Sequence, residues 1–294
     1  MKAIKNEVQK TAVHIVSNQF INPTNPIMVN LIGTGGTGSQ MLTALARINH
    51  ALICLQHPGF MVRVFDSDTV SSANLGRQLF TSAEIGLYKS VALVNRVNRF
   101  LGTNWKAIEE NYDKTTIASN KEYAMAELTI SCVDTVPARF EIAEILSPYI
   151  GKKNISRNQP VYWMDMGNSR YTGQVILSTI SRIDQPDSKK FIPVGELPLV
   201  TDEFKDLLNH AKKTDRTPSC SLAEALTEQD LFINSTLANF SASLLWQLCA
   251  TGMIFNRGLF LNLKDFRTQP LKIAPPVPVI KINTKSKKRQ RMTA

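Results

Sequence analysis

The chain has 294 residues, of which 43% are hydrophobic and 20% are charged. This length is enough to form one large domain with a full core or two smaller ones, and the composition is that of an ordinary globular protein. No apolar run approaches the roughly 20 residues of a membrane span, and the amino-terminal segment lacks the pattern of a signal peptide. We therefore expect neither a membrane span nor a signal peptide, and the four isolated cysteines favour a reducing cytoplasm.

The cysteine pattern and the net charge narrow the possible classes of protein and partner further. The four cysteines form no CxxC pair, which argues against disulfides and against structural zinc. The net charge is +10, but residues 281–294 carry six Lys and Arg and no acid, which leaves +4 for the rest. We interpret this basic tail as a solvated segment, with contact to nucleic acid or an acidic partner as the alternative.

The chain divides into an arm over residues 1–26, a main domain over 27–270 and an extended segment with the basic tail over 271–294. We expect the arm to be partly helical. In the first half of the main domain, apolar runs and periodicity predict strands at 26–32 and 60–65 and helices at 38–49 and 89–101.

The second half of the main domain continues this alternation. Further strands are predicted at 128–133, 161–166 and 173–180, and a helix at 138–149. Strands that alternate with helices predict an α/β, Rossmann-like fold, in which a mostly parallel sheet has helices on both faces.

A different pattern begins at residue 181. Residues 181–221 are polar and contain several prolines, which predicts a crossover region with little regular structure beyond a helix near 202–209. Helices at 221–226 and 229–255 and an extended edge segment then complete a carboxyl-terminal extension.

A glycine-rich turn, GTGGTG, follows the first predicted strand. Gly33 permits the tight bend, Gly35 and Gly36 let backbone N–H groups approach an anion, and Gly38 begins the helix. The pattern indicates a nucleotide-type turn but does not identify the nucleotide, and a dinucleotide oxidoreductase would also explain it.

Acidic side chains follow the next two predicted strands of the sheet. Asp66 lies 28 residues beyond Gly38 and suits a ribose hydroxyl, although an acid at a strand end also caps helices. Asp134 is suited to Mg²⁺ between phosphate oxygens, or to capping the helix near residue 137. Both acids belong to the edge at which such sheets bind ligands.

Two basic residues follow Asp66 in the sequence. Arg77 and Lys89 lie downstream of Asp66, beside Asn74 and Gln78, and together they suit a polyphosphate. A ribose-binding acid followed by cations, without a separate Lys-Ser/Thr phosphate loop, points to ATP used for adenylation rather than to a redox cofactor.

These motifs resemble the nucleotide site of ThiF/MoeB-type and ubiquitin-activating adenylyltransferases. The resemblance rests on GTGGTG, DSDTV at 66–70, NLGRQ at 74–78, Lys89 and Asp134, and it extends from about residue 29 to residue 180. The whole chain is most similar to the ThiF proteins of bacterial PRTRC operons.

The resemblance implies that ATP and Mg²⁺ bind at the strand ends and that the carboxyl-terminal glycine of a ubiquitin-like β-grasp protein attacks the α-phosphate. It assigns Asp66 to the ribose, Asn74, Arg77 and Lys89 to phosphates, and Asp134 to the metal. Gln78 and Thr135 belong to the same nucleotide site. Arg77 and Lys89, together with Mg²⁺, would neutralise charge during the reaction.

The chain departs from the family pattern at three places. Many homodimeric members receive a phosphate-binding arginine from the partner's amino-terminal region, but here no arginine precedes Arg47. Lys5 or Lys10 replaces it, or the subunit arrangement differs from the homodimer that we expect. Thr135 stands where the family often has asparagine, and the zinc-binding cysteine pairs of many relatives are absent.

A candidate nucleophile lies in the segment TPSCSLAEAL, which resembles the catalytic-cysteine region of ubiquitin-type activators. Ser221 and Glu224 fit a capping box, so Cys220 would precede a helix amino terminus, near Lys212, Lys213 and Arg216 in sequence. Such surroundings favour the thiolate that forms a thioester, and a downstream conjugating protein would receive it. The alternative is an ordinary loop cysteine.

Two other functions remain open from the sequence. An NAD-dependent oxidoreductase would use the glycine turn and Asp66, but it gives no role to Arg77, Gln78 and Lys89 together. A non-catalytic partner subunit would keep the fold, but inactive subunits usually lose phosphate-site residues. The four histidines show no metal spacing, and we assign them no role.

Overall fold

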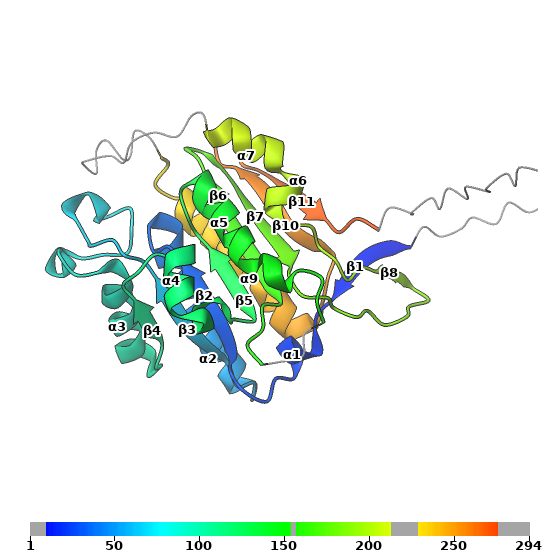
Figure 1. Ribbon diagram of the computed structural model, residues 1–294. Coiled ribbons are helices and arrows are strands. Elements are labelled where there is room, and N and C mark those ends of the chain that lie inside the picture. The colour runs from blue at the N-terminus through cyan, green and yellow to red at the C-terminus, as the bar shows by residue number, and fades with distance from the viewer. Residues whose placement is uncertain (1–9, 154–156, 213–228, 276–294) are drawn as a thin grey trace, which may run out of the picture.

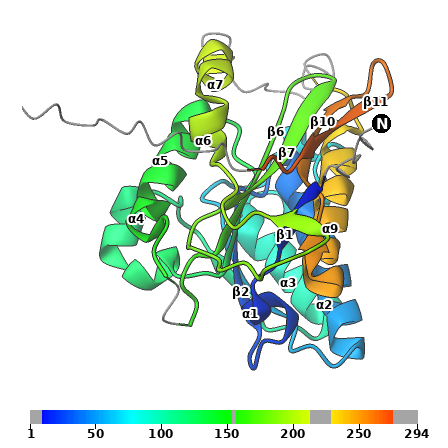
Figure 2. The same ribbon diagram turned by 90° about the vertical axis from the view of Figure 1, so that its right-hand side faces the viewer.

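A computed structural model describes residues 10–153, 157–212 and 229–275 (Figure 1). In these residues, an eight-stranded sheet has the order β11-β10-β7-β6-β5-β2-β3-β4, and a smaller sheet has the order β8-β1-β9. Helices cover both faces of the large sheet (Figure 2). The α/β fold class with a mostly parallel sheet is therefore confirmed. None of the helices in the described ranges is long and apolar enough to cross a bilayer.

One half of the large sheet is parallel and the other is antiparallel. The neighbours β6, β5, β2, β3 and β4 run parallel, whereas β7, β10 and β11 pair antiparallel beyond β6. The parallel strands are β2 (Ile27–Ile32), β3 (Phe60–Phe65), β4 (Lys106–Ile108), β5 (Leu128–Ser131) and β6 (Tyr162–Asn168). The antiparallel strands are β7 (Thr172–Thr179), β10 (Asn256–Asn262) and β11 (Arg267–Lys272).

The helices divide between the two faces of this sheet (Figure 2). One face carries α2 (Gly36–Cys54), α3 (Lys89–Leu101) and α9 (Ile233–Thr251). The other carries α4 (Lys114–Ser119), α5 (Val136–Leu146), α6 (Val200–Glu203) and α7 (Lys205–Lys212). Short 3₁₀ turns lie at Ser72–Asn74, Ser82–Glu84, Lys121–Ala124 and Ser147–Tyr149. Each face buries its own apolar cluster, because strands covered on both sides are hydrophobic throughout.

The amino-terminal arm contains a strand as well as a helix. β1 (Thr11–Ile15) pairs in parallel with β8 (Phe191–Pro193) and antiparallel with β9 (Met253–Ile254), and α1 covers Asn18–Ile21. The arm thus joins the crossover region and the carboxyl-terminal extension in one small sheet. The domain boundaries stay predictions, and the helix expected at 221–226 and the basic tail lie outside the described residues.

A buried histidine holds this small sheet to the main domain. His14 is fully buried, its Nδ1 donates to the Val194 carbonyl (2.6 Å), and its Nε2 lies 2.8 Å from the Tyr162 hydroxyl. Because a carbonyl only accepts, the proton is on Nδ1 and Nε2 accepts from Tyr162. The Tyr162 oxygen in turn accepts from the Ser17 amide (3.2 Å). Burial lowers the pKa of His14, so the ring is neutral in the folded protein.

We predict a pH-dependent loss of stability that originates at His14. The unfolded chain binds a proton at His14 more readily than the folded chain does, so stability falls as the pH drops from about 7 to about 5. His14→Gln removes this titration but keeps a donor and an acceptor. Urea unfolding across this range should give a flatter pH dependence for the variant. An equally steep decline in both proteins would contradict the assignment.

Candidate nucleotide-binding site

Three loops converge at one edge of the parallel sheet. β2 lies between β3 and β5, and the register pairs Ile32 with Phe65 on one side and with Ser131 on the other. The glycine turn after β2, the acidic loop after β3 and the Cys132–Thr135 loop after β5 therefore begin at the same level. This geometry brings together the residues that the sequence analysis selected for the nucleotide.

The backbone requires glycine at two positions of the turn. Gly33 has φ +82°, and a Cβ there would lie 3.0 Å from the Cys132 carbonyl oxygen. A Cβ on Gly38 would lie 1.9 Å from the Gly33 carbonyl oxygen, so no side chain fits. α2 then begins at Gly36, and its N-cap, Gly35, provides no side-chain acceptor. The N–H groups of its first turn remain available to an anion.

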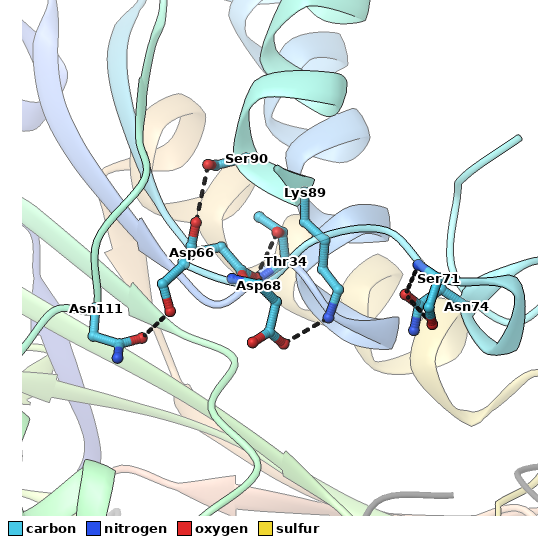
Figure 3. A network of polar contacts seen from close by, with 9 residues as sticks. Thr34, Asp66, Asp68, Ser71, Asn74, Lys89, Ser90 and Asn111 are labelled. Carbon is cyan, nitrogen blue, oxygen red and sulfur yellow. Dashed lines mark hydrogen bonds and ion pairs between the residues drawn. The ribbon is translucent and has the colours of Figure 1, made fainter. Parts of the chain in front are cut away.

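Asp66 supports the glycine turn in this structure (Figure 3). Its Oδ2 accepts from the Thr34 amide (2.6 Å) and hydroxyl (2.7 Å), and its Oδ1 accepts from the Asp68 amide (2.9 Å). The Ser90 hydroxyl donates to its backbone carbonyl. Asp66 thus joins the ends of β2 and β3 and the start of α3. Its assignment to a ribose stays a prediction.

Lys89 is the first residue of α3 and is 7% exposed. Its Nζ pairs with Asp68 Oδ2 (Figure 3), and the distance between these atoms is 2.7 Å. The Asp68 side chain is 69% exposed. A pair with one partner in solvent contributes little, about 0–1 kcal/mol. Asn74 bonds within its own turn, where its Oδ1 accepts from the Ser71 amide (2.8 Å) and hydroxyl (3.1 Å).

Arg77 and Gln78 each carry a buried polar atom without a hydrogen-bond partner among the described residues. These atoms are Arg77 Nε and Gln78 Oε1. The Gln78 side chain lies beside Gly35, where a Cβ would be 3.9 Å from Gln78 Nε2. Arg77 Nη1 donates to Gln229 Oε1 at 3.1 Å. An unpartnered buried polar atom costs about 1–3 kcal/mol of stability. Such atoms are rare in folded proteins, and a ligand that bonds to them would remove this cost.

Asp134 lies where the charges of this edge meet. The residue as a whole is exposed. The protein nevertheless desolvates its carboxyl group, which raises the pKa of Asp134, and the positive charges of Arg139, Arg77 and Lys89 oppose this shift. Arg77 and Lys89 are therefore close enough to act on Asp134. Thr135, rather than Asp134, caps α5, since its hydroxyl accepts from the Ala138 amide (3.4 Å).

A buried ion pair fixes the backbone around Asp134. Arg139 Nε donates to both Asp165 oxygens (3.2 and 3.1 Å), and its Nη2 donates to the carbonyls of Val133 (2.7 Å) and Met166 (3.1 Å). Asp165 also accepts from the Ser131 hydroxyl at 2.6 Å. Arg139 and Asp165 are 5% and 1% exposed. The guanidinium thus positions the Asp134 loop and adds a fixed positive charge beside it.

Sequence reasoning missed several residues that build this site. Arg139 and Asp165 looked like ordinary polar positions, and only the strand order brings them together. Asp68 lies within the DSDTV motif, and its spacing from Lys89 carried no signal of a pair. Gln229 and Asn234 come from the far end of the chain. Cys220 lies outside the described residues, so the structure does not place it.

The fold is Rossmann-like, and the loops at this edge form the candidate nucleotide site. The model of the ThiF family matches residues 11–276, and the chain belongs to this family. Ubiquitin-like modifier-activating enzyme 5 of Aedes aegypti is 31% identical over 126 residues, which are 39% of this chain and 29% of that protein. The same enzyme of Culex quinquefasciatus is 30% identical over 126 residues, which again are 39% of this chain and 29% of that protein. The chain thus matches about three tenths of these relatives' length.

Solved structures share the fold at low sequence identity. PaaA is 14% identical with a TM-score of 0.57, and the match covers 84% of this chain and 73% of PaaA. MccB of E. coli is 12% identical with a TM-score of 0.56, and the match covers 91% of this chain and 68% of MccB.

We predict that Arg139→Met destabilises the protein by about 3–5 kcal/mol, because it leaves Asp165 buried without its cation. Adding Asp165→Leu should recover most of this loss, since an apolar pair replaces the ion pair. Urea unfolding of both variants measures the difference. A double variant as unstable as Arg139→Met alone would show that the pair does not account for the cost.

Proposed function

We propose that this protein adenylates the carboxyl-terminal glycine of a ubiquitin-like β-grasp protein. The observation that carries the proposal is the convergence of charge at one sheet edge. The cations Arg77 and Lys89 act on the carboxyl group of Asp134, beside a glycine turn whose helix N-terminus has no side-chain cap. An oxidoreductase gives these cations no role.

The relatives support this class of reaction. The curated matches are activating enzymes for a ubiquitin-like modifier, and MccB has been solved with ATP and with MccA. In the proposed reaction, a carboxylate oxygen of the carrier forms a bond to the α-phosphorus of ATP. The bond between that phosphorus and the bridging oxygen breaks, which gives an acyl-adenylate and pyrophosphate. Within the family, we further propose that the chain is most similar to the ThiF proteins of bacterial PRTRC operons.

Arg77 and Lys89 are proposed to bind the phosphates. The Lys89–Asp68 pair is weak because Asp68 is exposed, so phosphate oxygens compete for Lys89 at small cost. Arg77 offers a planar set of donors that matches phosphate. Both cations oppose the negative charge that develops on the departing pyrophosphate. Asn74 and Gln78 are proposed to add amide contacts, and Asp66 a contact to the ribose.

The residues present fit a magnesium ion bound together with ATP. The described residues contain no group of three metal-binding side chains. Mg²⁺ in nucleotide sites needs only one or two carboxylates, because phosphates and water complete its shell. Asp134, which is an exposed residue, is the residue proposed to hold it, and Thr135 follows it in the sequence. When bound, the ion neutralises phosphate charge.

The proposed partners follow from the same function. They are the β-grasp carrier, a second copy of the chain in a homodimer, and a downstream conjugating protein. A lysine of the amino-terminal arm, Lys5 or Lys10, is proposed to replace the arginine that many homodimeric relatives supply. The basic tail remains the candidate for contacts with acidic partners.

We predict carrier-dependent exchange of radioactive pyrophosphate into ATP. The protein is incubated with ATP, Mg²⁺ and the small β-grasp protein encoded beside it. Asp134→Ala should reduce exchange by about 100-fold or more, because it removes the carboxylate proposed to hold Mg²⁺ at the reacting phosphates. Asp187→Ala, at an exposed loop position of the crossover region, serves as the matched control and should exchange normally. No exchange by the wild-type protein would refute the function.

Cys220 is proposed to receive the activated acyl group. Its thiolate would attack the acyl carbon and release AMP, which leaves a thioester. Two other cysteines suit this step poorly, because burial raises the pKa of Cys132 and raises that of Cys249 to about 12. Cys54 is exposed but lies at the far end of α2, about 27 Å along the helix from Gly36.

We predict that Cys220→Ala abolishes the reducible conjugate with the carrier but retains pyrophosphate exchange. Non-reducing gels with and without dithiothreitol measure the conjugate. Cys54→Ala is the control and should form it normally. A Cys220→Ala protein that still forms the conjugate would remove the nucleophile assignment and leave the adenylation proposal standing.

A further inference from the structure

A chain of amide side chains connects the glycine turn to Arg77. The Thr37 hydroxyl donates to Asn234 Oδ1 (2.8 Å), and Asn234 Nδ2 donates to Gln229 Oε1 (3.0 Å). The same Gln229 oxygen accepts from Arg77 Nη1 (3.1 Å). Asn234 lies in the first turn of α9, and Gln229 comes just before this helix.

This connection is anchored firmly on the side of the glycine turn. Thr37 and Asn234 are 6% and 3% exposed. A Cβ on Gly36 would lie 2.5 Å from the Asn234 side chain, so the asparagine packs directly on the turn. Asn168, at the end of β6, also donates to Asn234 Oδ1 (3.2 Å). Asn234 has little freedom to move, and it fixes the oxygen of Gln229.

The chemistry of Gln229 suits a residue that orients a cation for another ligand. An amide oxygen accepts from Arg77 but carries no charge, so the positive charge of Arg77 is not neutralised. The other two cations of this edge are bonded to carboxylates, Lys89 to Asp68 and Arg139 to Asp165. Of these three cations, Arg77 is therefore the one that is oriented by an uncharged partner.

We propose that Gln229 is a positioning residue, which holds the Arg77 guanidinium for the triphosphate and is itself held by Asn234. The inference rests on the proposed function, since Arg77 is assigned to phosphates there. A purely structural contact predicts something different. A glutamate would then replace Gln229 without loss, because its carboxylate also accepts from both Arg77 and Asn234.

The test is binding of α,β-methylene-ATP with Mg²⁺, measured by calorimetry beside binding of adenosine. Gln229→Met should weaken binding of the ATP analogue about tenfold, because Arg77 loses its acceptor. Gln229→Glu should weaken it as well, because the added charge opposes the phosphates. Adenosine has no phosphate, and its binding should be unchanged in both variants. In the Arg77→Met background, Gln229→Met should have no further effect.

A control separates a local effect from a general one. Gln247→Met lies at an exposed position of the same helix and should bind both ligands like the wild type. If Arg77→Met weakens binding but Gln229→Met or Gln229→Glu does not, the positioning role is refuted and the proposed function stands. Equal weakening of analogue and adenosine, or additive effects with Arg77→Met, also refutes it. A wild-type protein that binds no ATP analogue overturns the function and this inference together.

Discussion

The site depends on one geometric constraint, the parallel alignment of β3, β2 and β5. Because the three strands are neighbours and end at the same level, the loops that follow them meet at one edge. Asp66, Asp68 and Asp134 therefore lie near one another, and like charges at short range are unfavourable unless cations balance them. Lys89, Arg77 and Arg139 supply this balance, and the glycine turn can then present N–H groups to an anion.

The three cations have different kinds of partner. Arg139 is buried with Asp165 and serves the backbone of the Asp134 loop. Lys89 has a solvent-exposed partner, and Arg77 has a neutral one. Lys89 and Arg77 can therefore turn their charge to a ligand. Arg139 keeps the Asp134 loop in place. Under the proposed function, this division leaves Lys89 and Arg77 to bind phosphate.

The site also ties together distant parts of the chain. The glycine turn belongs to the first forty residues, whereas Gln229 and Asn234 precede or begin the long helix α9. α9 packs against α2 and β7 in the main core, so its position is set by the fold as a whole. The small sheet of β1, β8 and β9 joins the arm to the same body through His14.

Local patterns of the sequence predicted the elements that carry the site. The apolar runs of β2, β3 and β5, the glycine turn and the start of α3 at Lys89 lie at or within a few residues of their expected positions. Contacts that depend on tertiary packing were not predictable in this way. The partners of Arg139 and Arg77 lie 26 and 152 residues away, and the small strands β1, β8 and β9 acquire their structure from pairing.

The most direct measurement is a crystal structure with a non-hydrolysable ATP analogue and Mg²⁺. The account predicts the triphosphate against the glycine turn, with Arg77 and Lys89 bonded to its oxygens and the metal beside Asp134. Nucleotide bound elsewhere, or Arg77 and Lys89 directed away from the phosphates, would contradict it.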